Sequence, residues 1–332
     1  MSRSSKAPPN PPDPGRREVL RRLGTATALA AACGAAAYHL HDDKHPVRTP
    51  GGPDREIPDH RVEVPAATPS MIIARGPDPA ANTRAALERL GVMGKLIQKG
   101  DLVVVKPNIG WDRRPEQAAN TNPHVVAEVV RACVAAGAAR VIVTDHPVND
   151  PRRCFERSGI SAAVEEAGGT IKVPGDRDFY MVSIPGKLGR WPVFEPFITA
   201  TKVINIPVVK HHSLTQATLG VKNWYGILGG RRNQLHQRID DSVAELALLM
   251  RPTLTVMDAT RVLLRNGPTG GSLGDVKRMD SVAVSLDPVA VDAWGCTLLG
   301  AKPEEQGWLQ LGQNKKLGVL DYRSLNPVEI KS

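Results

Sequence analysis

The sequence predicts an α/β fold: a largely parallel sheet that is built from βαβ units, flanked by helices and arranged in one lobe or two. Three successive segments support it, namely a short apolar run at 101–106, a helical pattern at 122–136 and a second apolar run at 140–145. Continuous apolar, β-branched runs are typical of strands that are buried on both faces. A strand, helix and strand in this order form a βαβ unit, which presents ligands at the carboxyl ends of its strands.

The residues at the ends of these segments support the same elements. Pro107 and Asn108 follow the first apolar run and stop it. Asn122 can cap the helix, Pro123 suits its first turn, and Gly137 ends it.

The second half of the chain repeats this alternation of strands and helices. We expect further elements at 202–207, 241–250, 253–258, 281–285 and 288–299. Asp287 is the expected N-cap of the last helix, because Pro288 follows it directly. Asp292 is expected on the surface of that helix.

The chain divides into four expected parts: an export signal at 1–37, a linker at 38–69, the α/β domain at 70–320 and a C-terminal tail at 321–332. The linker is rich in Pro, Asp, His and Gly and has no periodicity. Hydrophobic residues make up 41% of the chain, which is enough for a core of this size.

The export signal is predicted to be of the twin-arginine type. Arg16 and Arg17 precede an uncharged, Ala-rich stretch at 23–37, which at about 15 residues is too short for a comfortable membrane span. We therefore expect the twin-arginine translocation machinery as a partner, with the protein periplasmic, extracellular or membrane-tethered. Cleavage before Tyr38, a lipoprotein-like cut before Cys33 and retention of an uncleaved signal all stay open.

Composition and charge argue against a nucleic-acid-binding surface. Aromatic residues make up only 4% of the chain. The net charge is +9, but residues 1–37 contain six basic and two acidic side chains, so the remainder carries only +5. This mild excess is spread along the chain, and it favours a site for an anionic small molecule over a nucleic-acid partner. The oligomeric state does not follow from the sequence.

The four cysteines, at positions 33, 133, 154 and 296, contain no CxxC pair. That spacing matches neither a zinc ribbon nor a cysteine-ligated iron–sulfur motif. The chain is therefore not expected to ligate its own iron–sulfur cluster, and the cysteines are most simply core residues. A single Cys133–Cys154 disulfide stays open.

Lysines, histidines and glycines gather in the segment 208–236. Glycines allow a backbone to approach a ligand closely, and lysine or arginine side chains bind carboxylate or phosphate. Imidazole adds proton transfer or metal binding, although no H-E-x-x-H motif is present, so a metal or metal-containing cofactor stays unidentified. We expect catalytic roles for Lys222, His236 and His212, ligand binding by Lys106, Asn108, Lys210, Asn223, Arg231 and Asp258, and metal binding by His212 and His236.

Several of these polar residues follow predicted strands. Lys106 and Asn108 end one strand, Asp145 and His146 end the next, and Asp258 ends a later one. They would meet at one edge of a parallel sheet, where the acids would orient ligands. Each also has a structural alternative: a strand-end lysine can snorkel to solvent, and an acid at a strand end can cap the next turn.

Short phrases along residues 71–300 resemble the domain of unknown function 362 family. They are Val105-Lys106-Pro107-Asn108, Thr121-Asn122-Pro123, Lys210-His211-His212-Ser213-Leu214-Thr215, Leu219-Gly220-Val221-Lys222-Asn223, Asn266-Gly267-Pro268 and Asp287-Pro288-Val289-Ala290-Val291-Asp292. The resemblance implies an α/β domain that in many relatives is called iron–sulfur associated. This sequence lacks the Cys-rich segment that those relatives append.

The sequence is more distantly similar to the nickel-pincer lactate racemases. Those enzymes have a lysine in a glycine-rich loop and a histidine one helical stretch later, and Lys222 and His236 match these two places. In that family the lysine is bound covalently to the cofactor and the histidine ligates nickel.

Two classes of function follow from these residues. The first is an exported enzyme that binds an anionic small molecule or a metal-containing cofactor in a Lys- and His-lined pocket. The second is a non-catalytic binding or electron-transfer partner that acts outside the cytoplasm.

Overall fold

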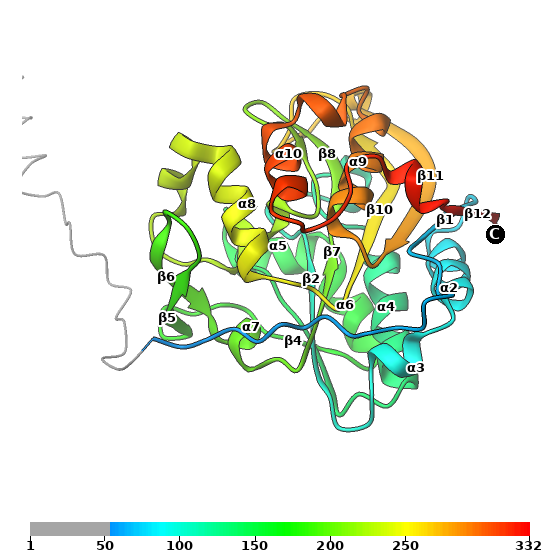
Figure 1. Ribbon diagram of the computed structural model, residues 1–332, viewed down its shortest axis with the longest axis horizontal. Coiled ribbons are helices and arrows are strands. Elements are labelled where there is room, and N and C mark those ends of the chain that lie inside the picture. The colour runs from blue at the N-terminus through cyan, green and yellow to red at the C-terminus, as the bar shows by residue number, and fades with distance from the viewer. Residues whose placement is uncertain (1–53) are drawn as a thin grey trace, which may run out of the picture. The chain divides into compact units, whose positions relative to one another are not determined.

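The computed structural model describes residues 54–332, and a ten-stranded sheet runs through this part of the chain (Figure 1). The main path of the sheet has the order β12, β1, β11, β10, β7, β2, β3 and β4, and β8 and β9 branch from β10. The strands are β1 (Met71–Arg75), β2 (Leu102–Pro107), β3 (Arg140–Val143), β4 (Thr170–Ile171), β7 (Lys202–Ile206), β8 (Val208–His212), β9 (Gln216–Thr218), β10 (Leu254–Leu263), β11 (Val276–Ser285) and β12 (Val328–Lys331).

Most neighbouring strands in this sheet are parallel, as predicted. The central strand β2 pairs in parallel with β3 and β7, and β10 pairs in parallel with β7 and β8. The antiparallel pairs join β11 to β1 and β10, and β9 to β8. Parallel strands end at the same edge, so β2, β3 and β7 bring their carboxyl ends together.

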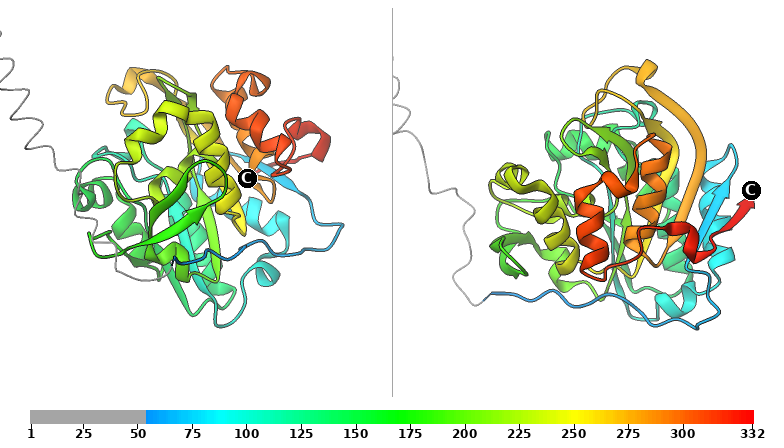
Figure 2. Two further views of the ribbon diagram at one scale, coloured as in Figure 1. Left: turned by 60° about the vertical axis from the view of Figure 1, so that its left-hand side comes forward. Right: turned by 45° about the horizontal axis from the view of Figure 1, so that its top comes forward.

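Helices cover both faces of the sheet, because alternate residues of each strand point to opposite sides. In β1, Ile72 and Ala74 belong to one core, with helices α2 (Pro79–Leu90), α4 (Pro123–Ala135) and α6 (Ile160–Glu166). Met71 and Ile73 belong to the other core. That core contains residues of α7 (Glu195–Thr199), α8 (Ile239–Leu249), α9 (Pro288–Leu298) and α10 (Gly307–Asn314). The views in Figure 2 show these helices around the sheet.

The remaining elements are short. They are the helices α3 (Met93–Leu96) and α5 (Pro151–Arg157), the hairpin of β5 (Phe179–Ile184) and β6 (Gly189–Phe194), and the 3₁₀ turns η1 (Pro115–Gln117), η2 (Lys222–Ile227), η3 (Arg232–Arg238), η4 (Leu273–Asp275), η5 (Pro303–Glu305) and η6 (Tyr322–Leu325). The turn η2 lies within the Lys- and His-rich segment 208–236, η3 begins in it, and both carry several of its side chains.

The two expected helix caps are confirmed. The side chain of Asn122 accepts a hydrogen bond from the backbone N–H of His124, at the start of α4. The side chain of Asp287 accepts from Val289 and Ala290 at the start of α9.

The domain extends beyond both ends that the sequence predicts. Residues from 54 onward are hydrogen-bonded to the domain. The backbone N–H of Arg55 donates to the carbonyl of Met181, and the hydroxyl of Thr253 donates to the carbonyl of the buried His60. At the other end β12 pairs with β1 instead of forming a tail (Figure 1). These segments belong to the domain because their backbone groups bond to it. The predicted signal and residues 38–53 of the expected linker lie outside the described residues.

Across residues 54–332, none of the helices has both the length and the apolarity to cross a membrane.

Cys133, Cys154 and Cys296 are buried and free, so the disulfide left open by the sequence is not formed. Burial raises the pKa of the Cys133 thiol to about 12, which makes it an inert core residue at neutral pH.

Candidate functional site

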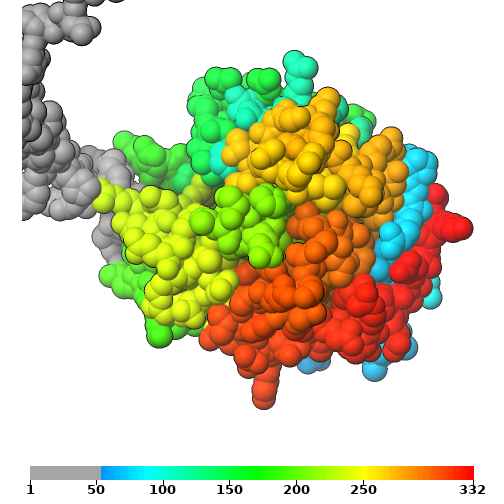
Figure 3. Space-filling view, turned by 90° about the horizontal axis from the view of Figure 1, so that it is seen from above, coloured from blue at the N-terminus to red at the C-terminus, as the bar shows by residue number. Residues whose placement is uncertain are grey.

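A cavity of about 520 Å³ lies at the carboxyl ends of β2 and β3, between them and the segment 208–236. Its volume is in the range of small-molecule sites. Among residues 54–332, the basic side chains in its wall are Lys210, Lys222, Arg232, His146, His212 and His236, and the acidic one is Asp145. We call this space the Lys/His cavity. The face of the molecule that carries β8, η3 and the loop after β10 is shown in Figure 3.

Asp145 neutralises a lysine behind the cavity wall. The Nζ atom of Lys106 lies 2.7 Å from Oδ1 of Asp145, and both side chains are buried. Asp145 also accepts the backbone N–H groups of Ile109 and His146, so its carboxylate is held from three directions. Burial lowers the pKa of Lys106, and the charge of Asp145 partly offsets this effect. The structure thus pairs Lys106 with Asp145, and Lys106 does not line the cavity.

Two asparagines connect this pair to Lys210. Oδ1 of Asn223 accepts from Nζ of Lys106 at 3.1 Å and from Nδ2 of Asn108 at 3.0 Å. Oδ1 of Asn108 then accepts from Nζ of Lys210 at 2.9 Å. Four predicted residues therefore form one hydrogen-bonded network at the strand ends, and a network satisfied in this way holds its side chains in place.

Lys210 is buried, and no carboxylate of the described residues pairs with it. Its ammonium donates to the carbonyl of Ala119 at 2.6 Å, in addition to Asn108. Burial lowers the pKa of Lys210 to about 7, and the charge of Lys106 acts in the same direction. The lowered pKa makes the uncharged amine accessible near neutral pH, and an anion beside it would favour the charged form.

Lys222 lies in η2 and reaches the cavity wall. Its side chain is 6% exposed, and no hydrogen bond or ion pair joins it to another residue of the described chain. Burial lowers its pKa to about 6, again with a contribution from the charge of Lys210. Lys222 thus presents an amine to the cavity without a partner from the described chain.

Asp292 positions the loop that leads to Lys222. Its two carboxylate oxygens accept the backbone N–H groups of Gly220 at 2.7 Å and Val221 at 2.8 Å. The expectation of a surface position for Asp292 was wrong, because the side chain is 0% exposed. Burial raises its pKa to about 8, against the lowering effect of the two N–H donors. The sequence contained a sign of this burial, because Asp292 lies within an apolar run. Burying a carboxylate there costs free energy unless hydrogen bonds compensate its charge.

Hydrogen bonds assign different tautomers to the two histidines of the cavity. Nδ1 of His212 accepts from the backbone N–H of Leu214 at 3.1 Å, so its proton is on Nε2. Nδ1 of His236 faces the carbonyl of Asn233 at 3.1 Å, so it carries the proton and Nε2 has the free lone pair. The two rings are nearly parallel, with centroids 6.1 Å apart. His212 can therefore donate a hydrogen bond, and His236 can accept a proton.

The donor set that the described residues provide at this position does not complete a protein-ligated zinc site. A structural zinc site has four protein ligands and a catalytic one has three. Within residues 54–332, no three His, Cys, Asp or Glu side chains are grouped so that they could hold an ion. His212 and His236 alone do not complete such a site, and the chemistry below uses only the side chains of this chain.

Two other predicted residues lie away from the cavity wall. Asp258 accepts from the backbone N–H of Asn122 and from the hydroxyl of Thr260, both at 2.7 Å, so it joins β10 to the start of α4. The expectation that this strand ends at Asp258 was wrong, because β10 continues to Leu263 along β11. Arg231 does not line the cavity, whereas its neighbour Arg232 does. Arg232 donates to the carbonyls of His146 and Pro147, each at 2.6 Å, and so joins η3 to the loop after β3.

Sequence reasoning missed Tyr225 in the cavity wall. Its ring lies at an edge-to-face angle to His236, with centroids 5.4 Å apart, and its hydroxyl donates to the carbonyl of Leu235. The residue is in the same polar segment, but a tyrosine beside Trp224 in the sequence gives no sign that one ring enters the core and the other the cavity wall.

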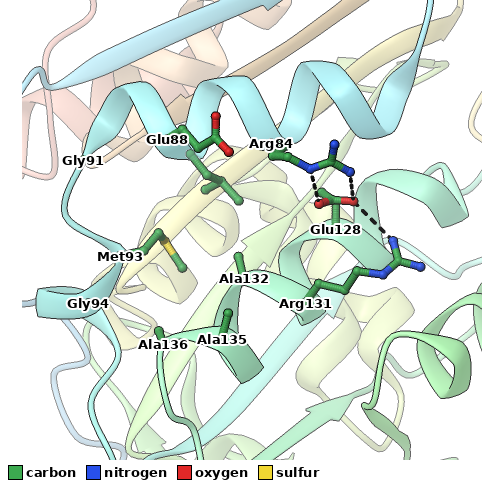
Figure 4. A pocket seen from close by; sticks show the side chains of 11 residues that line it. Arg84, Glu88, Gly91, Met93, Gly94, Glu128, Arg131, Ala132, Ala135 and Ala136 are labelled. Carbon is green, nitrogen blue, oxygen red and sulfur yellow. Dashed lines mark hydrogen bonds and ion pairs between the residues drawn. The ribbon is translucent and has the colours of Figure 1, made fainter.

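A second cavity, of about 530 Å³, lies between α2 and α4 (Figure 4). Glu128 forms ion pairs with both Arg84 and Arg131 at its edge, and Leu87 and Ala132 are among its apolar lining residues. The arginines are thus already paired with an acid, and none of the described residues that line this space is a lysine, histidine or cysteine. The Lys/His cavity is therefore the better candidate for chemistry.

The fold and the cavity define an α/β protein with a Lys- and His-lined site at the carboxyl ends of its strands. The chain belongs to the family described as domain of unknown function (DUF362), whose sequence model matches residues 103–297. The resemblance found in the sequence is thus confirmed.

Two individual proteins are similar to this chain. A thylakoid-associated protein of Synechocystis sp. is 28% identical over 230 residues, which cover 64% of this chain and 67% of that protein. The lactate racemase apoprotein from Thermoanaerobacterium thermosaccharolyticum aligns with a TM-score of 0.39 and 13% identity, over 74% of this chain and 62% of the racemase. This chain therefore spans less than two thirds of the racemase structure.

Proposed function

We propose that the protein is an enzyme that binds a small organic anion in the Lys/His cavity and moves a proton to or from it. The observation that carries this proposal is the charge imbalance of the site. Lys106, Lys210, Lys222 and Arg232 lie in or directly behind the wall, and Asp145 is the acidic side chain that faces them. Because Asp145 is occupied by Lys106, an anionic ligand is the natural partner of the other three.

The histidines supply the proton-transfer groups. Nε2–H of His212 can donate to an oxygen of the ligand, and the lone pair on Nε2 of His236 can accept a proton from it. Burial lowers the pKa of His212 to about 3, so His212 is neutral at physiological pH and acts as a hydrogen-bond donor. Burial also lowers the pKa of His236, which keeps that ring available as a base. The two rings therefore have complementary roles.

Export by the twin-arginine pathway is the second part of the proposal. It is supported by Arg16, Arg17 and the Ala-rich stretch 23–37. A protein that uses this pathway would carry out its reaction in the periplasm, outside the cell or at the membrane surface.

Native mass spectrometry of the full chain, purified from a host with a working twin-arginine pathway, tests the anion site. We expect a small anionic molecule that is released on denaturation, or saturable binding of added phosphate or pyruvate. Both should be lost in Lys210→Met and kept in Lys277→Met, which changes an exposed lysine of β11. A polypeptide that carries no ligand and binds neither probe would contradict the proposal.

A further inference from the structure

Lys222 differs from the other two lysines at the site in what its amine contacts. Lys106 has a carboxylate and an amide oxygen as partners, and Lys210 has an amide and a carbonyl oxygen. Lys222 is as enclosed as a core residue, at 6% exposure, yet no described residue accepts a hydrogen bond from it. An amine in this position is free to act on a ligand.

We propose that Lys222 forms an imine with the carbonyl group of an anionic carbonyl compound, a refinement that rests on the proposed anion site. The ligand class is a small aldehyde or ketone that also carries a carboxylate or a phosphate. The cavity of about 520 Å³ is large enough for such a molecule together with water. Lys210 and Arg232, also in its wall, would hold the anionic group while Lys222 meets the carbonyl carbon.

The reaction is balanced with the groups that are present. The amine lone pair of Lys222 attacks the carbonyl carbon, a C–N bond forms, and the nitrogen loses a proton as the oxygen gains one. The nitrogen lone pair then forms the C=N bond as the C–O bond breaks, and the oxygen leaves as water after it takes up the second proton of the nitrogen. His236 can take the proton from nitrogen and return it to the departing oxygen through Nε2.

An imine needs an uncharged amine, and the surroundings of Lys222 favour that form. Lys210, His212 and His236 are the titratable groups that interact with Lys222, and none of them is an acid. The lowered pKa of Lys222 is in line with this environment, because a desolvated lysine beside another cation is the usual way to activate an amine.

Asp292 also contributes, through the backbone. It holds the N–H groups of Gly220 and Val221, the two residues immediately before Lys222. A Cβ atom at Gly220 would lie 2.7 Å from Oδ1 of Asp292, so glycine is required for this close approach. The position of the amine is thus fixed by a buried contact that does not use the side chain of Lys222.

Reductive trapping of the full chain tests the proposal. The protein is incubated with pyruvate or with dihydroxyacetone phosphate, each in the presence of cyanoborohydride, then digested and mapped by mass spectrometry. We expect a reduced adduct on Lys222 with at least one probe, in yield at least tenfold above any other lysine. The two probes distinguish a carboxylate ligand from a phosphate ligand. No adduct with either probe, or equal labelling of exposed lysines, would overturn the imine.

A matched variant separates this proposal from the anion site itself. Lys222→Arg keeps an N–H donor at the wall but cannot form an imine, so it should bind phosphate by calorimetry and give no adduct. Lys277→Arg, at an exposed position, should behave like the parent. If the parent protein binds phosphate but forms no reduced adduct, the imine proposal is wrong and the proposed anion-binding function stands. If the parent neither binds nor is trapped, both fail.

Discussion

Nζ of Lys106 and Oδ1 of Asp145 form a buried ion pair at 2.7 Å, which joins the ends of β2 and β3 behind the Lys/His cavity. Removing one member of a buried pair leaves the other charge without compensation. We therefore predict that Asp145→Asn lowers the free energy of unfolding by roughly 3–5 kcal/mol, measured by urea denaturation. As the control, Glu305→Gln breaks the exposed Lys302–Glu305 pair and should leave the free energy of unfolding nearly unchanged. Equal effects of the two substitutions would refute the role given to Asp145.

Gly226 packs directly against the Lys106–Asp145 ion pair, where a side chain would not fit. A Cβ atom at position 226 would overlap Oδ1 of Asp145 and lie 2.7 Å from Nζ of Lys106. We predict that Gly226→Ala destabilises the fold by about 1–3 kcal/mol, because the buried pair has no room to move. Gly94→Ala is the matched control, since a Cβ atom there meets nothing within 4 Å. Thermal denaturation of both variants checks this, and a neutral Gly226→Ala would show that the packing is looser than described.

The lysines of the cavity should make stability depend on pH. In the folded protein, burial lowers the pKa of Lys222 to about 6 and the pKa of Lys210 to about 7. The ordinary pKa of a lysine is 10.5. Between these values the unfolded chain binds more protons, so the free energy of unfolding rises as the pH increases. Each lysine contributes up to about 1.4 kcal/mol per pH unit.

The double variant Lys210→Met with Lys222→Met isolates this effect. Other groups also titrate above neutral pH, but the difference between the parent and the variant removes their contribution. Urea denaturation at a series of pH values above 7 should give a flatter dependence for the variant. An unchanged slope would show that the two amines keep their ordinary pKa values.

Export depends on the arginine pair. We predict that Arg16→Lys with Arg17→Lys leaves the full-length precursor in the cytoplasm of a host with the twin-arginine pathway. Arg21→Lys with Arg22→Lys keeps the same charge and is the control, which should be exported normally. Cell fractionation and immunoblotting report the location. Export of both variants alike would point to another route.

Local patterns were sufficient to predict the elements that carry the site. The apolar run that became β2 and the Asn122 and Pro123 signals of α4 are properties of neighbouring residues, so the sequence alone indicates them. Lys106 and Asn108 were then placed correctly at the edge of the sheet, because parallel strands end together. Asp145 lies beside Lys106 for the same reason, because β2 and β3 are parallel and end at the same edge of the sheet.

Relationships between distant segments could not be predicted in this way. Asp292 binds a loop 72 residues earlier in the chain, so its burial depends on how α9 packs. The sequence places three lysines and several acids near the predicted site, but it does not indicate which of them form ion pairs. In the structure Asp145 pairs with Lys106, and no described carboxylate pairs with Lys222. Which charges are compensated is decided by the tertiary structure.

The most direct test of the anion site is calorimetric titration of the full chain with dihydroxyacetone phosphate near neutral pH, in two buffers of different ionisation enthalpy. Binding should be saturable and should take up protons, because an anion raises the lowered pKa values of Lys210 and Lys222. The double variant Lys210→Met with Lys222→Met should bind at least tenfold more weakly and take up fewer protons. Identical isotherms for the parent and the variant, or no saturable binding by the parent, would contradict the account.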